Sequence, residues 1–184
     1  MKIPVTTIRL PTRPAREYES RFDREQSLLK MLAIPIASVA IASMITALPI
    51  FTEEPLLPPL GLLMFLSWRL MRPGLLPVWS GVPFGLMDDV FSGQPFGSAG
   101  LLWSLAMLSI EIIDARAIWR DHIQDWLIAA VLIAGVLLGG LWIAGMAHAA
   151  PAPAVLIPQI ILSILLYPLA VRICARLDSW RLAT

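Results

Sequence analysis

The uncharged apolar segment 126–146 constrains the fold of this chain more than any other feature. Its 21 residues would form a helix about 30 Å long, which matches the hydrocarbon thickness of a bilayer. A second uncharged run, of 20 residues, spans 31–50. Hydrophobic residues make up 58% of the chain and charged residues only 15%, against about a quarter charged in soluble domains. The sequence therefore predicts an integral protein of the lipid bilayer.

Further apolar segments around these two runs predict an all-α bundle of six transmembrane helices between residues 30 and 173. The expected spans are 31–50, 55–71, 75–92, 97–113, 126–146 and 155–171. Residues 1–29 are rich in charge and contain prolines, which predicts a basic, largely disordered cytoplasmic arm. In residues 174–184 apolar side chains alternate with arginines at helical spacing, which predicts a tail along the membrane interface.

The basic residues test this number of spans. All 14 lysines and arginines fall in the N-terminal arm, the connections after the second and fourth spans, and the tail. With six spans these segments lie on one side of the membrane, while the opposite side carries Glu53 and Glu54. Basic loops stay in the cytoplasm, so the pattern predicts that both termini are cytoplasmic. Arg69, in the last turn of the second span, is expected to extend to the nearby interface.

Two adjacent carboxylates, Asp88 and Asp89, lie in the third expected span, whose prolines and glycines leave a short or broken helix open. They come about one helical turn before its end, so both are expected near the outer interface. Adjacent helix positions are about 100° apart, so at most one is expected to face the bundle interior. Three roles stay open: ordering the following turn through its backbone amides, contacting another protein, or chemistry. The depth favours the first role.

The sequence favours a protein that is not an enzyme. His122 and His148 fall on opposite sides of the expected bundle, so they cannot share a metal ion. The single cysteine, Cys174, cannot form an internal disulfide. Carboxylates at the outer face could hold a divalent ion, but exposed carboxylates are more often solvated. Basic residues follow a membrane face and do not form a compact patch for nucleic acid. We therefore expect no catalytic residues, no metal, no cofactor and no nucleic-acid partner.

Small residues repeat at four-residue spacing in the first and fifth spans, where they would let helix backbones approach closely. In the fifth span they are Gly135, Gly139, Gly140 and Ala144. In the first span they form the pairs Ala33 with Ala37, Ser38 with Ala42, and Ser43 with Ala47. Packing within the bundle and docking of an additional helix both stay open. Six of the seven tryptophans lie near span ends and are expected to anchor at the interface.

One family resemblance rests on motif residues within the segment 59–97. They are Trp68, Arg72, Pro73, Gly85, Leu86, Asp88, Gly93, Pro95, Phe96 and Gly97. With them the segment resembles the rod shape-determining protein MreD family, although Phe96 stands where a leucine is usual. The resemblance extends loosely over the hydropathy profile from about residue 28 to the end, and leaves out the N-terminal arm.

The resemblance implies a non-catalytic, multi-pass protein of the bacterial inner membrane that belongs to the cell-elongation machinery. It implies a scaffold needed for rod shape, which organises lateral peptidoglycan synthesis. An MreC-like single-span protein would be its direct partner, and MreB, RodA and a class B penicillin-binding protein its indirect ones. Motif residues for structure or partner binding would be Arg72, Pro73, Gly85, Asp88, Gly93 and Gly97. Asp88 is expected to order the outer turn.

The resemblance also implies a fold similar to the substrate-binding component of energy-coupling factor transporters. This supplies an alternative function, the substrate-binding component of a vitamin transporter. Such a component needs polar or aromatic groups that converge on an outward-opening pocket. The outer half of the chain offers few, chiefly Gln94, Gln159 and Trp103, so the sequence favours the scaffold.

Overall fold

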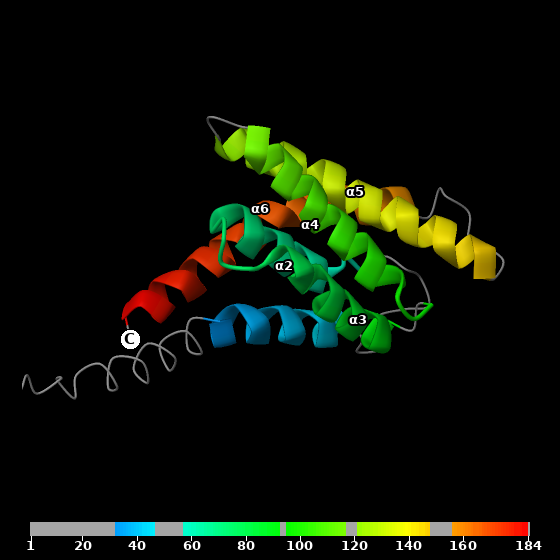
Figure 1. Cartoon of the computed structure of the whole chain (residues 1–184), viewed down its shortest axis with the longest axis horizontal. Coiled ribbons are helices and arrows are strands. Elements are labelled where there is room, and N and C mark those ends of the chain that lie inside the picture. The colour runs from blue at the N-terminus through cyan, green and yellow to red at the C-terminus, as the bar shows by residue number, and fades with distance from the viewer. Residues whose placement is uncertain (1–31, 47–56, 93–94, 117–120, 148–155, 184) are drawn as a thin grey trace, which may run out of the picture.

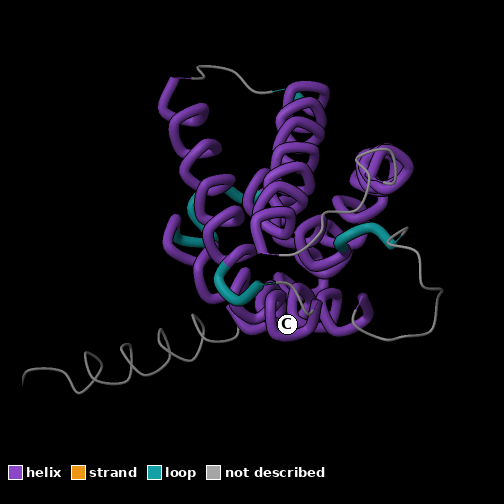
Figure 2. The backbone as a smooth tube through the Cα atoms, turned by 90° about the vertical axis from the view of Figure 1, so that its right-hand side faces the viewer, coloured by secondary structure: helices purple, strands orange, loops and turns teal. Residues whose placement is uncertain are grey.

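The structure is a computed structural model, and it describes residues 32–46, 57–92, 95–116, 121–147 and 156–183. Every regular element in these ranges is a helix (Figure 2). The elements are a first helix (Leu32–Thr46), α2 (Leu60–Met71), the 3₁₀ helix η1 (Val78–Ser80), α3 (Gly81–Ser92), α4 (Ser98–Arg116), α5 (His122–Ala147) and α6 (Leu156–Ala183). The predicted all-α class is confirmed.

Three of the described helices, α4, α5 and α6, are long and apolar enough to cross a membrane. The first helix and α2 are apolar but shorter, and α3 has 12 residues. At 1.5 Å per residue α3 is about 18 Å long, less than the hydrocarbon thickness. The expected third span is thus a turn, η1 and a short helix, with Pro77 immediately before η1. Six complete spans and two cytoplasmic termini stay predictions.

Successive helices run in opposite directions along the bundle (Figure 1). Contacts between helix ends agree with this arrangement. Arg69, in the last turn of α2, pairs with Glu111 and Asp114 near the end of α4. Arg72, directly after α2, pairs with Asp178 near the end of α6. The C-terminal ends of α2, α4 and α6 therefore meet at one end of the bundle, which we call the charged end. The predicted topology requires this juxtaposition.

Helix α2 lies at the centre of the bundle, because every residue from Gly61 to Leu70 is buried. A helix that is apolar on all sides is stable only when other elements surround it. Phe65 stacks on Trp103 of α4 with ring centroids 5.1 Å apart, and its centroid lies 5.5 Å from that of Phe84 on α3. These aromatic contacts hold α3 and α4 against the central helix.

Two side chains of α2 differ from the sequence predictions. Trp68, expected at the interface, is fully buried, and its indole N–H donates to the Ser38 hydroxyl of the first helix over 2.9 Å. Arg69, expected to extend to the interface, is only 3% exposed and meets two carboxylates of α4. The Trp68 indole N–H and Nη2 of Arg69 each find a partner on another helix. Such a partner replaces water in a place where an isolated charge or donor would be costly.

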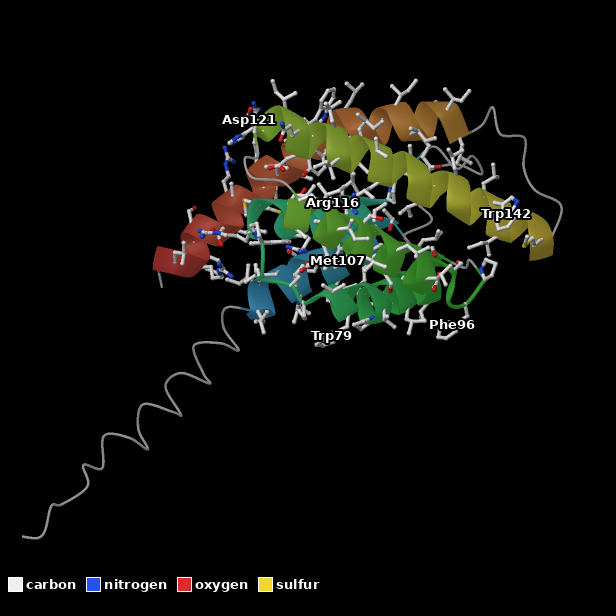
Figure 3. The ribbon with its side chains drawn as sticks, turned by 45° about the horizontal axis from the view of Figure 1, so that its top comes forward. Trp79, Phe96, Met107, Arg116, Asp121 and Trp142 are labelled. Carbon is white, nitrogen blue, oxygen red and sulfur yellow. The ribbon has the colours of Figure 1, made fainter. Side chains whose placement is uncertain are left out.

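Other tryptophans lie on the outside of the bundle. Trp79, Trp142 and Phe96 point outward in Figure 3, and the side chain of each is at least 69% exposed. Trp180 is exposed as well. Exposed tryptophan rings suit the boundary between lipid and water, and their anchoring there stays a prediction.

Helix α6 continues without a break through the residues predicted as a separate tail. It runs for 28 residues, and Cys174 and Asp178 in its second half are buried. The ion pair of Asp178 with Arg72 supplies the physical reason, because it holds this part of α6 against the turn after α2. The expected boundary at residue 173 has no counterpart in the helix. A position of the tail at the interface stays a prediction.

Pro168 interrupts the backbone hydrogen bonding inside α6. Proline has no N–H, so the carbonyl of Ile164, four residues earlier, loses its usual helical partner. The indole N–H of Trp126 on α5 donates to that carbonyl over 3.3 Å. Lipid cannot supply a donor, so a carbonyl freed in a bilayer needs a partner of this kind. Trp126 therefore couples α5 to the proline turn of α6.

Replacing Trp126 by phenylalanine is expected to lower the free energy of unfolding by about 0.6–1.7 kcal/mol, the range typical of hydrogen bonds between membrane helices. In a Pro168→Ala background the same replacement is expected to cost close to nothing, because alanine returns an N–H to the Ile164 carbonyl. Reversible unfolding in mixed detergent micelles measures both costs. Equal costs of Trp126→Phe in the two backgrounds would show that the indole and the proline are not coupled.

Candidate functional site

Helices α3 and α4 approach each other at backbone distance. A Cβ atom added to Gly85 would lie 2.5 Å from backbone atoms of Ala99 and Gly100. A Cβ atom added to Gly81 would lie 2.8 Å from backbone atoms of Ser104. Gly81 and Gly85 are four residues apart and share one face of α3, so together they form a close-packing surface against α4. No larger residue fits at either position unless α4 moves.

Asp89 continues this face by one more turn and caps the start of α4. Its Oδ2 accepts the backbone N–H of Gly97 at 2.8 Å and that of Gly100 at 3.4 Å. Its Oδ1 accepts the backbone N–H of Ala99 at 2.9 Å and the hydroxyl of Ser98 at 3.0 Å. The side chain is almost fully buried, at 3% exposure. A carboxylate also suits the partial positive charge of a helix N-terminus.

The start of α4 has no backbone N–H left over. The first N–H groups of any helix lack a partner within the helix. Here the N–H of Ser98 donates to the Pro95 carbonyl, and that of Leu101 donates to the Gly97 carbonyl. Those of Ala99 and Gly100 go to Asp89. The neighbouring helix thus completes the cap that lipid could not provide.

Within the described residues Asp89, and not Asp88, binds the amides at the start of α4, which corrects the expectation placed on Asp88. The reason is angular: Asp89 is four residues beyond Gly85 and faces α4 with it, whereas Asp88 lies about 100° away. The sequence contained the signal, since Gly81, Gly85 and Asp89 follow one another at four-residue spacing.

Asp88 lies toward the first helix and α2 instead. The Ser43 hydroxyl oxygen and Asp88 Oδ1 both lie within 3.2 Å of the place where a Cβ atom on Gly61 would sit. Ser43 is fully buried and Asp88 is half-buried. The absent side chain of Gly61 therefore leaves the room in which this hydroxyl and carboxyl lie. Both aspartates contact neighbouring helices, which corrects the expectation that at most one faces the interior. Helices on two sides of α3 account for this.

The remaining motif residues have separate structural positions. Gly97 has a φ of +95°, a left-handed conformation that favours glycine, and its N–H donates to Asp89. Pro73 is exposed in the turn after α2, where the next residue, Gly74, has a φ of +88°. Gly93 lies outside the described residues. The motif is thus not gathered in one site, because its members lie at both ends of α3.

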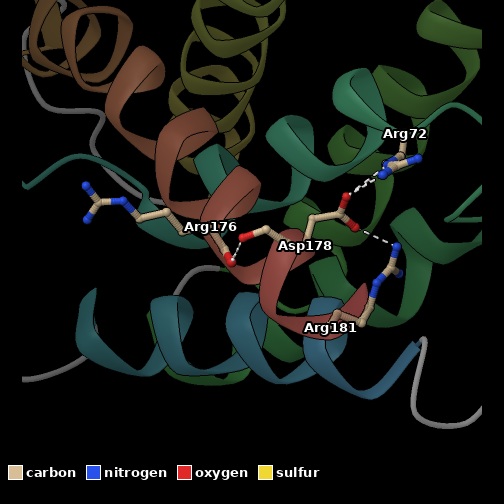
Figure 4. Close-up of polar contacts among 5 residues, drawn as sticks. Arg72, Arg176, Asp178 and Arg181 are labelled. Carbon is tan, nitrogen blue, oxygen red and sulfur yellow. Dashed lines mark hydrogen bonds and ion pairs between the residues drawn. The ribbon is translucent and has the colours of Figure 1, made fainter. Parts of the chain in front are cut away.

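At the charged end, Asp178 of α6 lies between two arginines (Figure 4). Its Oδ2 accepts hydrogen bonds from Nε and Nη2 of Arg72 at 3.0 and 2.6 Å. Its Oδ1 pairs with Arg181, whose guanidinium carbon lies 5.9 Å from the ring centroid of Trp68. Asp178 and Arg181 are nearly buried, while the Arg72 side chain is half exposed. One carboxylate thus ties the turn after α2 to the end of α6.

An apolar groove of about 460 Å³ lies between the first helix and α6, with α2 as its floor. Ala37, Ser38 and Ala42 line it from the first helix, and Ala170 lines it from α6. Three of the small residues singled out in the first span therefore border an open surface. Ser43, from the same span, packs inward at Gly61. Ala47 lies outside the described residues.

The small residues of the fifth span are divided between two environments. A Cβ atom added to Gly139 would lie 2.6 Å from the end of the Leu102 side chain on α4, so this glycine packs within the bundle. The same atom on Gly135 would have nothing within 4 Å. Gly140 and Ala144 are half-buried. The predicted packing surface on α5 is therefore used at Gly139 and open at Gly135.

The described part of the chain offers no metal site built from three or more His, Cys, Asp or Glu side chains. Glu53, Glu54 and His148, which the sequence brought into consideration, lie outside the described residues. Glu111, Asp114 and Asp178, near the charged end, are instead paired with arginines.

In a comparison with protein families, the model of rod shape-determining protein MreD matches residues 25–176. No curated protein and no solved structure matches the chain significantly. The matched region contains the α3–α4 contact and both aspartates, whereas Asp178 and Arg181 fall beyond it.

An Asp89→Asn variant is expected to lose about 2 kcal/mol of unfolding free energy, because buried donors at the start of α4 lose part of their acceptor. Asp88→Asn is the matched control and is expected to lose less than about 1 kcal/mol, since Asp88 accepts none of these amides. Unfolding in mixed micelles measures both variants. A larger loss for Asp88→Asn would overturn the assignment of the cap.

A Gly85→Ala variant is expected to lose about 1–3 kcal/mol, because its methyl group would press into the α4 backbone. Gly135→Ala adds the same methyl group on α5 where no atom lies within 4 Å. That variant is expected to be unchanged or up to about 1 kcal/mol more stable, since alanine favours helix. Thermal melting of the two purified variants compares them, and equal melting temperatures would contradict the close α3–α4 contact.

Proposed function

The chain belongs to the rod shape-determining protein MreD family, and from this membership we propose that it is a non-catalytic scaffold of the bacterial inner membrane. The family has a role in rod shape determination. In this proposal the protein acts within the cell-elongation machinery and organises lateral peptidoglycan synthesis. MreB, RodA and a class B penicillin-binding protein are indirect partners, reached through a single-span protein of the MreC type.

One observation carries the scaffold proposal: the conspicuous polar side chains of the motif region are engaged in holding helices together. Asp89 caps α4, Arg72 pairs with Asp178, and Arg69 pairs with carboxylates of α4. A catalytic group needs a partly free, reactive atom near a place for a substrate. Charged side chains that are paired with other helices suit a rigid frame better than a reaction centre.

The groove between the first helix and α6 is the surface that we assign to the single-span partner. Between membrane helices the hydrophobic effect gives no driving force, so association depends on close packing, which small side chains permit. Ala37, Ser38 and Ala170 line this groove, and its other lining side chains are apolar. Side chains of a transmembrane helix that lies across the groove would pack between the first helix and α6.

The vitamin-transporter alternative is less well supported by the positions of its candidate groups. The amide of Gln159 donates to the Leu57 carbonyl over 2.7 Å. Trp103 is buried and stacks on Phe65. Gln94 lies outside the described residues. Neither Gln159 nor Trp103 lines the groove between the first helix and α6. A small molecule retained through purification and identified by mass spectrometry would favour this alternative.

Filling the groove with an Ala37→Trp substitution is expected to reduce co-purification of the single-span partner at least tenfold. Ala37 lines the groove and is exposed, so the substitution leaves the bundle intact. Ala33→Trp is the matched control, because Ala33 is exposed one turn earlier on the same helix and does not line the groove. Pull-down from mild detergent measures partner recovery, normalised to the amount of folded protein.

In a rod-shaped host, cells that carry only Ala37→Trp are expected to round up, while cells with Ala33→Trp keep their shape. Loss of partner binding by both variants alike would contradict the groove as the docking surface. Rod shape retained after complete depletion of the protein would contradict the scaffold function itself.

A further inference from the structure

A second pocket, of about 430 Å³, lies at the charged end of the bundle, on a different side from the groove. It is formed by the end of α2, the start of α5, and α6 beside Pro168. Its lining residues are Leu70, Met71, His122, Asp125, Trp126, Tyr167, Pro168, Val171 and Arg172. None of the family motif residues and none of the groove residues belongs to it.

The lining of the pocket changes from apolar to polar along α5 and α6. A bilayer changes in the same way from its hydrocarbon core to its head groups. On α5, His122 and Asp125 come directly before the uncharged run that begins at Trp126. On α6, Arg172 is the first charged residue after an apolar segment. Leu70, Met71 and Val171 contribute apolar side chains to the same pocket. Both helices therefore place their polar groups at the level of lipid head groups and their apolar groups toward the acyl chains.

The polar side of the pocket is suited to a phosphodiester. Arg172 is exposed and forms no ion pair with a described residue, so its guanidinium is available for bidentate binding of phosphate. The N-terminus of α5, a helix of 26 residues, adds a partial positive charge, which Asp125 in its first turn partly offsets. Asp125 also lines the pocket, which disfavours a doubly charged anion. A phosphodiester carries a single negative charge and matches the single positive charge of Arg172.

We infer that this pocket binds one phospholipid from the leaflet at the charged end. Its phosphate lies at Arg172 and the start of α5, and an acyl chain lies along Leu70, Met71 and Val171. The lipid fills the space beside Pro168, where α6 departs from regular helical hydrogen bonding. The inference concerns a different surface from the proposed docking groove and does not depend on the scaffold function.

The test uses the full-length protein, delipidated in mild detergent and titrated with phosphatidylglycerol under native mass spectrometry. Wild-type protein is expected to bind one lipid more tightly than the others. Arg172→Gln is expected to weaken that first binding step about tenfold, the effect of losing one charged hydrogen-bonding partner. Arg176→Gln is the matched control, because Arg176 is an exposed arginine one turn along α6 that does not line the pocket. Its affinity is expected to stay within twofold of wild type.

A second measurement needs no substitution. Phosphatidylglycerol with a photoreactive diazirine in an acyl chain is expected to label Leu70, Met71 or Val171 before lipid-facing residues such as Ile161. Equal weakening by Arg172→Gln and Arg176→Gln, or labelling spread evenly over the outer faces, would overturn the inference. Displacement of the bound lipid by millimolar inorganic phosphate would also overturn it, since the pocket would then recognise a free anion and not a lipid.

Discussion

The structure depends most on the need to satisfy backbone amides where no water is available. The start of α4 presents N–H groups that a soluble helix could leave to solvent, and in this bundle they donate to a carboxylate of the preceding helix. Asp89 can reach them only because Gly81 and Gly85 let the two helix backbones approach. The cap formed by Asp89 therefore depends on the close helix packing that the two glycines allow.

The opposite end of the bundle is held by charge. Arg69 and Arg72 follow one another at the end of α2 and pair with carboxylates from two different helices, α4 and α6. Away from water an isolated arginine would be costly, whereas a paired one fixes which helix ends lie together. Helix α2 is buried along its length and passes between the two ends. A short central helix thus joins a capped end to a charged end, and leaves the outer faces apolar.

Much of this arrangement could be predicted from the sequence, because uncharged runs and their length follow directly from bilayer thickness. The helical class and the positions of α4, α5 and α6 were accessible for that reason. The interaction partners that side chains find on other helices could not be predicted. Trp68 and Arg69 look like interfacial residues until the helices that cover them are known. Asp88 and Asp89 are adjacent in sequence, and only the four-residue spacing from Gly85 separates their roles. The inward packing of Asp178 was not predicted, because the arginines around it suggested a surface tail.

In the proposed function, the motif region serves shape determination by building the frame and has no chemistry of its own. The most direct test compares rod-shape rescue with the amount of folded protein in cells that carry only the Asp89→Asn variant. Rescue is expected to fall in proportion to folded protein, and to return when expression is raised until the folded amount equals that of wild type. Lost rod shape at the wild-type amount of folded protein would contradict it, because the carboxylate would then have a function beyond the cap of α4.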